Sequence, residues 1–99
     1  MSVGMRKPTK IRIDDIHLDP VTLAGYETPE QQERINSMAK SLKVKGQLEP
    51  IIINPDLATI WRGHTRYFAA KKLKWEFIEA IVVDGKEWND YIGSNGAQI

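Results

Sequence analysis

One abrupt change of pattern, in residues 60–73, constrains the fold of this chain more than any other feature. Residues 59–62 are typical of a strand, and the segment from about His64 to Leu73 is typical of a helix. Gly63 stands between them, where a sharp bend needs the positive φ angles that glycine permits. The sequence therefore predicts a strand, a tight turn and a helix in immediate succession.

The start of that helix is expected to attract an anion. The first N–H groups of a helix have no partner within it and carry partial positive charge. Arg62 and Arg66 flank this position, and arginine can grip a phosphate with two N–H groups. His64 and Thr65 supply further donors. From these residues alone two interpretations stay equally open: a phosphate pocket, or a structural turn in which Arg66 pairs with a surface carboxylate.

The segment 60–73 is expected to belong to a single domain that spans residues 10–92. A flexible tail at 1–9 should precede this domain, and a frayed end at 93–99 should follow it. Strands are predicted at 10–14, 50–54, 59–62 and 77–84, with a loop at 21–27. A helix should begin after Thr28, with Pro29 in its first turn and Gln31 completing a capping box, and end at Gly46. One helical turn at 86–91 should place its aromatic residues, Trp88 and Tyr91, over the core.

Composition excludes several classes of protein. The chain has no cysteine, which excludes a disulfide scaffold and a cysteine nucleophile. Its formal net charge is +1, so any nucleic-acid surface must be a local patch. No apolar run has membrane-spanning length, no signal peptide is visible, and no zinc-ligand spacing occurs. We therefore expect a cytoplasmic protein with no metal site and no membrane partner.

Two segments resemble the signatures of one family. Residues 63–70, Gly-His-Thr-Arg-Tyr-Phe-Ala-Ala, resemble the Gly-x-x-Arg-x-x-Ala-Ala box of the ParB N-terminal domain, which shares its fold with sulfiredoxin. Residues 45–52, Lys-Gly-Gln-Leu-Glu-Pro-Ile-Ile, resemble the family's Gly-x-x-x-Pro-Ile segment. The two boxes stand in the family order, and the resemblance covers roughly residues 10–84. It implies an α/β (α+β) fold of the ParB/sulfiredoxin type, a small mixed β-sheet with packed helices.

The resemblance also implies a nucleotide site that holds a nucleoside triphosphate such as CTP or ATP. The residues expected to bind the phosphates or to line the facing wall are Arg62, Gly63, His64, Thr65, Arg66, Gln47 and Pro50. Glu49 lies beside both boxes and is the candidate catalytic base, against the simpler interpretation of a surface glutamate.

Departures from the family pattern limit the chemistry. Sulfiredoxin needs a catalytic cysteine in this loop, and the matching position here is His64, so that activity is excluded. Many relatives carry Asp before the box, where this chain has Arg62. Because that carboxylate can help to hold Mg²⁺ beside the nucleotide, its absence here leaves open whether Mg²⁺ is required. A DNA clamp that closes on CTP is not expected from this chain alone. Weak nucleotidase or ParB-like nuclease activity stays an open alternative to simple binding.

Two further functions compete with nucleotide binding. Lys71, Lys72 and Lys74, with aromatic residues among them, form a basic segment that suits the backbone and bases of DNA. The resemblance to small stand-alone domains of phages and plasmids instead suggests an adaptor for a protein partner, or a homodimer. That last hypothesis predicts an exposed apolar patch around Trp88 and Tyr91.

Overall fold

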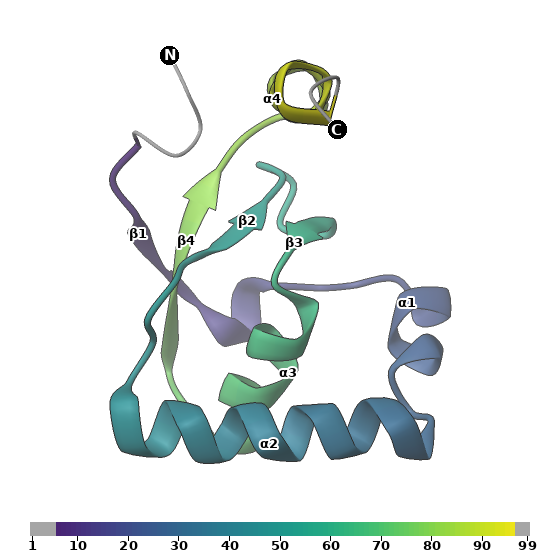
Figure 1. The fold of residues 1–99 in the computed structure, drawn as a ribbon, viewed down its shortest axis with the longest axis vertical. Coiled ribbons are helices and arrows are strands. Elements are labelled where there is room, and N and C mark those ends of the chain that lie inside the picture. The colour runs from purple at the N-terminus through teal and green to yellow at the C-terminus, as the bar shows by residue number, and fades with distance from the viewer. Residues whose placement is uncertain (1–5, 97–99) are drawn as a thin grey trace.

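The structure is a computed structural model that describes residues 6–96 of the 99-residue chain. Its helices and strands follow one another as β1 (Thr9–Arg12), a short 3₁₀ helix η2 (Ile13–Asp15), α1 (Pro20–Gly25), α2 (Pro29–Lys45), β2 (Ile51–Ile53), β3 (Ile60–Arg62), α3 (His64–Lys72), β4 (Phe77–Val82) and α4 (Gly85–Gly96) (Figure 1).

The four strands form one mixed sheet in the order β1-β4-β2-β3. β4 runs antiparallel to β1 and parallel to β2, and β2 and β3 form an antiparallel hairpin. All three residues of β2 are buried, because helices cover both faces of this strand. The predicted mixed sheet with packed helices is confirmed.

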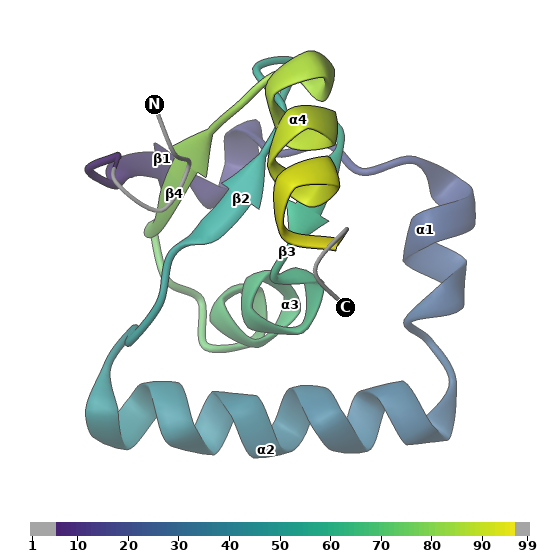
Figure 2. The ribbon, with the colours of Figure 1, turned by 45° about the horizontal axis from the view of Figure 1, so that its top comes forward.

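Alternate residues of the central strands face two different cores. Ile51 and Ile53 of β2 belong to the larger core, to which α2 and α3 contribute. Ile52 faces the other way, toward a smaller cluster with Val83, Trp88 and partly buried Tyr91. Figures 1 and 2 accordingly show α3 between α2 and the sheet, and α4 far from α2. The aromatic residues of α4 therefore cover the core, as expected, and do not form the exposed patch that the adaptor hypothesis predicted.

Helix α2 has the predicted boundaries. The Thr28 hydroxyl accepts a hydrogen bond from the backbone N–H of Gln31 at 3.3 Å, and Pro29 occupies the first turn. Gly46 ends the helix with a φ of 73°, in the left-handed region that favours glycine. One side of the helix faces the core, where Ile35 and Leu42 are buried. No helix in the part of the chain that the structure describes is long and apolar enough to cross a membrane.

The loop predicted at 21–27 is wrong, because α1 occupies most of it. The Asp19 carboxylate accepts hydrogen bonds from the backbone N–H and the hydroxyl of Thr22, both at 2.8 Å. Pro20 then supplies the first helical position. Asp-Pro at 19–20 therefore caps a helix here instead of turning the chain.

The predicted ends of the folded region are also corrected. Thr9 belongs to β1, and Arg6 donates to the Val82 carbonyl at 2.8 Å and forms an ion pair with Glu87, so neither residue is part of a tail. Residues 1–5 and 97–99 lie outside the described part. At the other end, α4 continues through residues 93–96, which were expected to be frayed, and is longer than the predicted single turn. The first strand is shorter than predicted, because the 3₁₀ helix begins at Ile13.

Candidate anion-binding site

The turn between β3 and α3 depends on Gly63. Its φ is 105°, a conformation that residues with a side chain rarely adopt. A Cβ atom built there would lie 2.7 Å from Cγ2 of Ile51, because the turn passes directly over β2. The Gly63 carbonyl accepts the first helical hydrogen bond, from Tyr67 N–H at 3.0 Å. The earlier N–H groups of α3 are therefore left for capping groups, water or a ligand.

These N–H groups belong to residues that border a hollow of about 320 Å³. Its lining comprises Tyr26, Met38, Glu49, Arg62, Gly63, His64, Thr65 and Arg66. The structure thus brings together every predicted phosphate-binding residue of the 62–66 segment, together with Glu49. Two arginines and a helix N-terminus give this hollow the character of an anion site.

Arg66 lines the hollow and also pairs with a carboxylate. Its Nη2 lies 3.8 Å from Oε2 of Glu49, with the Arg66 side chain 18% exposed and that of Glu49 67% exposed. Because the carboxylate is exposed and lies 3.8 Å away, the pair is weak, and an incoming anion can compete for the guanidinium. The exposed Arg62 guanidinium makes no hydrogen bond or ion pair with any of the described residues. The sequence left two interpretations of Arg66 open, a phosphate ligand and the partner of a surface carboxylate. The observed geometry is compatible with both.

His64 is held by aromatic packing. Its ring stacks on Tyr26 with centroids 5.4 Å apart and planes 13° apart, and Tyr26 in turn packs on Phe68 at 4.8 Å. Burial lowers the pKa of His64 below its ordinary value of 6.5, because it disfavours the charged imidazolium. At pH 7 the ring is therefore a neutral group with one N–H donor.

Two predicted wall residues do not line the hollow. The Gln47 side-chain amide donates to the Glu79 carbonyl at 2.8 Å and to the Glu49 carbonyl at 3.0 Å, and it accepts from Glu79 N–H at 2.8 Å. Through these bonds, the Gln47 side chain holds the segment before β2 against β4. Pro50 lies between that segment and β2 and is also outside the lining.

The predicted DNA-contacting lysines lie at and just beyond the other end of α3. Lys71, Lys72 and Lys74 are all exposed. Lys72 donates to the Asn36 side chain, and the Lys71 ammonium lies 5.9 Å from the centre of the Tyr67 ring. These lysines therefore form a surface separate from the anion-binding hollow.

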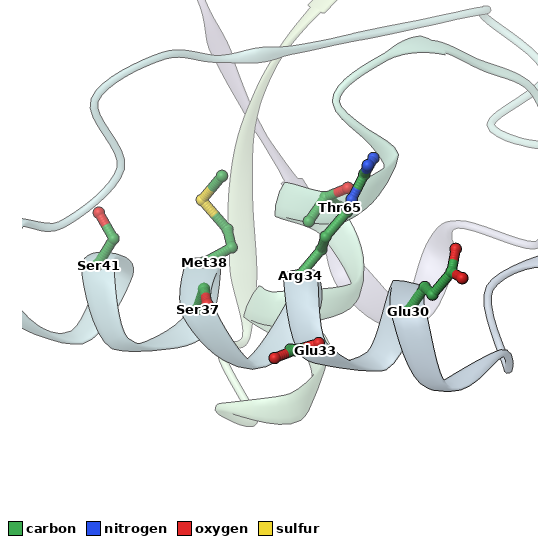
Figure 3. A pocket seen from close by; sticks show the side chains of 7 residues that line it. All are labelled: Glu30, Glu33, Arg34, Ser37, Met38, Ser41 and Thr65. Carbon is green, nitrogen blue, oxygen red and sulfur yellow. The ribbon is translucent and has the colours of Figure 1, made fainter.

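A second hollow, which the sequence did not predict, runs along α2 (Figure 3). It has a volume of about 770 Å³ and is lined by Glu30, Glu33, Arg34, Ser37, Met38, Ser41 and Thr65. Met38 and Thr65 also line the smaller hollow, so the two adjoin. The signal available in the sequence was the helical spacing of residues 30, 34, 38 and 41, which places them along one side of α2.

No group of three or more His, Cys, Asp or Glu residues that could hold a metal ion occurs within residues 6–96.

Comparison with known proteins identifies relatives over most of the chain. The family model described as the ParB N-terminal domain matches residues 4–95. The nucleoid occlusion protein of Shouchella clausii (strain KSM-K16) is 36% identical over 61 residues, which make up 60% of this chain and 20% of that protein. The chain thus spans only about a fifth of that relative's length.

Solved structures confirm the predicted fold. The C-terminally truncated chromosome-partitioning protein ParB of Caulobacter crescentus, complexed with CTP-gamma-S, matches with a TM-score of 0.62 and 21% identity, over 95% of this chain and 55% of that one. A Pnob8-like ParB-N domain matches with a TM-score of 0.62 and 20% identity, over 91% of this chain and 37% of that one. Sulfiredoxin from Arabidopsis thaliana matches with a TM-score of 0.63 and 18% identity, over 88% of this chain and 98% of that one.

Proposed function

Because the chain belongs to the ParB N-terminal domain family, we propose that it binds a nucleoside triphosphate through phosphates placed at the N-terminus of α3. One observation carries the proposal: Arg62, Thr65 and Arg66 line one hollow at the point where α3 leaves its first N–H groups free. Anions are stabilised at such helix ends, and bidentate arginine contacts add strength and direction.

Each residue of the hollow has a proposed role. Arg66, the more buried arginine, is the main phosphate ligand, and the exposed Arg62 adds positive charge at the rim. Thr65 donates through its hydroxyl, and neutral His64 donates one N–H. Glu49 is the counter-ion that Arg66 releases when the phosphate arrives, and we assign it no catalytic role. Binding without substantial turnover follows from these roles.

CTP is the first nucleotide to test. The ParB of Caulobacter crescentus was solved in complex with CTP-gamma-S, and its fold matches 95% of this chain. The groups assigned roles in the hollow act on phosphate, which all nucleoside triphosphates share. ATP, GTP and UTP therefore belong in the same experiment.

The test is a thermal-shift series with the four nucleotides, each with and without Mg²⁺, on the parent chain and on Arg66→Ala. A ligand at about a hundred times its Kd stabilises the folded state by roughly 2.7 kcal/mol. We expect a shift with at least one nucleotide that disappears in Arg66→Ala. Lys71→Ala, a loss of the same charge farther along α3, is the control and should keep the shift. Equal shifts in the parent and in Arg66→Ala would overturn the assignment of the site.

We propose DNA binding as a second candidate function, supported by the exposure of Lys71, Lys72 and Lys74 together at the far end of α3. Lysine contacts to phosphates release counterions, so the affinity should fall steeply with salt. Measuring DNA binding between 50 and 200 mM salt tests this, with the three lysines changed to Ala as a set. An affinity that ignores both salt and these substitutions would contradict it.

A further inference from the structure

The hollow along α2 ends where the proposed phosphate site begins. Thr65, the second residue of α3, lines both hollows, and Met38 of α2 lines both from the other side. The two hollows therefore adjoin, and a ligand at the α3 N-terminus lies beside the hollow along α2. The residues that α2 contributes to this hollow come from outside both family boxes, so neither box predicts what this half of the site binds.

Among the described residues that line the hollow along α2, Arg34 is the one cationic residue. It is exposed, and its guanidinium makes no hydrogen bond or ion pair with any residue in the described range 6–96. Figure 3 shows its side chain extending from α2 in the direction of the α3 start, where Thr65 lies. Arg34 is thus a free bidentate donor on the side of α2 that faces the first anion site.

The carboxylates of the same hollow are arranged differently. Figure 3 shows Glu33 pointing away from the α3 start, along the other side of α2. Glu30 lies one turn before Arg34, at the N-terminal end of the helix, and forms no ion pair with it. Among the charged residues that line this hollow, Arg34 is therefore the one whose side chain extends toward Thr65 in Figure 3.

From this placement we propose that Arg34 binds the distal phosphates of a polyphosphate whose first phosphate lies at the N-terminus of α3. The inference rests on the proposed function for the position of the first phosphate. It adds a preference for the number of phosphates in the ligand: the site binds triphosphates more tightly than monophosphates, because α2 supplies a second cationic group. Arg34 is then the residue that determines this specificity. A monophosphate contacts the α3 start alone and does not reach Arg34.

The test compares ligands that differ in phosphate number. ¹H–¹⁵N chemical-shift titrations, which also read weak affinities, are run with inorganic tripolyphosphate and orthophosphate, and with CTP and CMP. The parent is compared with Arg34→Gln, with the charge-conserving Arg34→Lys, and with Lys40→Gln, which removes an exposed positive charge from α2 outside both hollows. The Arg34 Nε–H resonance reports contact directly.

We expect tripolyphosphate to bind the parent at least tenfold more tightly than orthophosphate and to shift the Arg34 side-chain resonance. Arg34→Gln should weaken tripolyphosphate binding about tenfold and leave orthophosphate binding unchanged within twofold, as expected for loss of one charge-assisted pair. The tripolyphosphate affinity of Arg34→Lys should lie between those of the parent and Arg34→Gln, and that of Lys40→Gln should equal the parent's. Equal weakening of both ligands by Arg34→Gln, no effect on either, or no binding of tripolyphosphate to the parent would overturn the proposal.

The nucleotide titrations separate this inference from the proposed function. If tripolyphosphate responds to Arg34→Gln while no nucleotide binds, the nucleotide function is wrong and the role of Arg34 stands. If CTP binding depends on Arg66 but CTP and CMP respond equally to Arg34→Gln, the nucleotide function stands and the role of Arg34 is wrong.

Discussion

Oε2 of Glu49 lies 3.8 Å from Nη2 of Arg66, so the one carboxylate among the described residues lining the hollow at α3 is paired with the arginine proposed to bind phosphate. The two residues come from different elements: Glu49 precedes β2, and Arg66 lies in the first turn of α3. An anion must therefore displace a carboxylate to obtain the full donor capacity of Arg66.

Glu49→Gln is predicted to raise nucleotide affinity. The substitution removes the competing charge and its repulsion of the phosphates, and an exposed pair of this kind is worth up to about 1 kcal/mol, or roughly fivefold in Kd. Titration calorimetry of the parent and the variant measures the change. Asp90→Asn, an identical loss of charge on α4, should leave the Kd unchanged. A weaker Kd in Glu49→Gln would mean that Glu49 itself contacts the nucleotide.

Gly63→Ala is predicted to destabilise the fold by about 2–4 kcal/mol, since backbone strain and steric overlap act together. The φ of 105° is unfavourable for alanine, and the new Cβ would lie 2.7 Å from Cγ2 of Ile51. Urea unfolding measures the free-energy difference. Gly93→Ala is the matched control: it lies in α4 with open space around it and should stabilise by up to about 1 kcal/mol. A loss below 1 kcal/mol in Gly63→Ala would contradict the described turn.

His64 predicts a pH dependence of stability. Its pKa in the folded state lies below the ordinary value of 6.5, so between the two values the unfolded chain binds more protons than the folded chain. Stability should therefore fall as pH drops through 6.5 and continue to fall until the folded-state pKa is passed. Thermal unfolding at pH 7.5 and 5.5 should show a smaller acid-induced loss in His64→Gln than in the parent. His17→Gln serves as the control, and equal losses in the parent and His64→Gln would refute the argument.

Arg6→Ala is predicted to loosen α4. Arg6 joins the Val82 carbonyl, at the end of β4, to Glu87 in the first turn of the helix. Losing these bonds should cost about 1–2 kcal/mol and accelerate hydrogen exchange in α4 more than in α2. Lys7→Ala, at an exposed neighbouring position, should exchange like the parent. Unchanged exchange in α4 would show that its aromatic contacts alone hold it.

The elements that the sequence predicted well carry strong local signals. Thr28 and Gly46 mark the ends of α2, and a run of isoleucines marks β2. The missed α1 began at an Asp-Pro pair that suits a turn and a capped helix equally, and only the bonds from Asp19 to Thr22 distinguish the two. Because of the glycines near the C-terminal end of the chain, the helix predicted at α4 was too short. In the structure, Trp88 of this helix packs on the sheet.

The candidate site divides in the same way. The half contributed by residues 62–66 is continuous in sequence, so a local pattern could predict it. Arg34 and Tyr26 come from elements distant in sequence, and only the packing of α1, α2 and α3 brings them to the hollows. The family box suggests Gln47 as a wall of the pocket, whereas in the structure its amide bonds the backbone of β4 and Gln47 is outside the lining.

The central position of β4 has a consequence for how the protein is made. Thr9 pairs with Ala80, and Ile51 pairs with the same residue from the other side, so one late segment joins both early strands. While the chain is still emerging from the ribosome, β1 has no partner in the sheet until β4 is synthesised, and β2 has only its hairpin partner β3. The apolar residues of β2 must therefore be protected during translation by the hairpin and by α2 and α3, and a ribosome that stalls before residue 77 holds a chain exposed to aggregation.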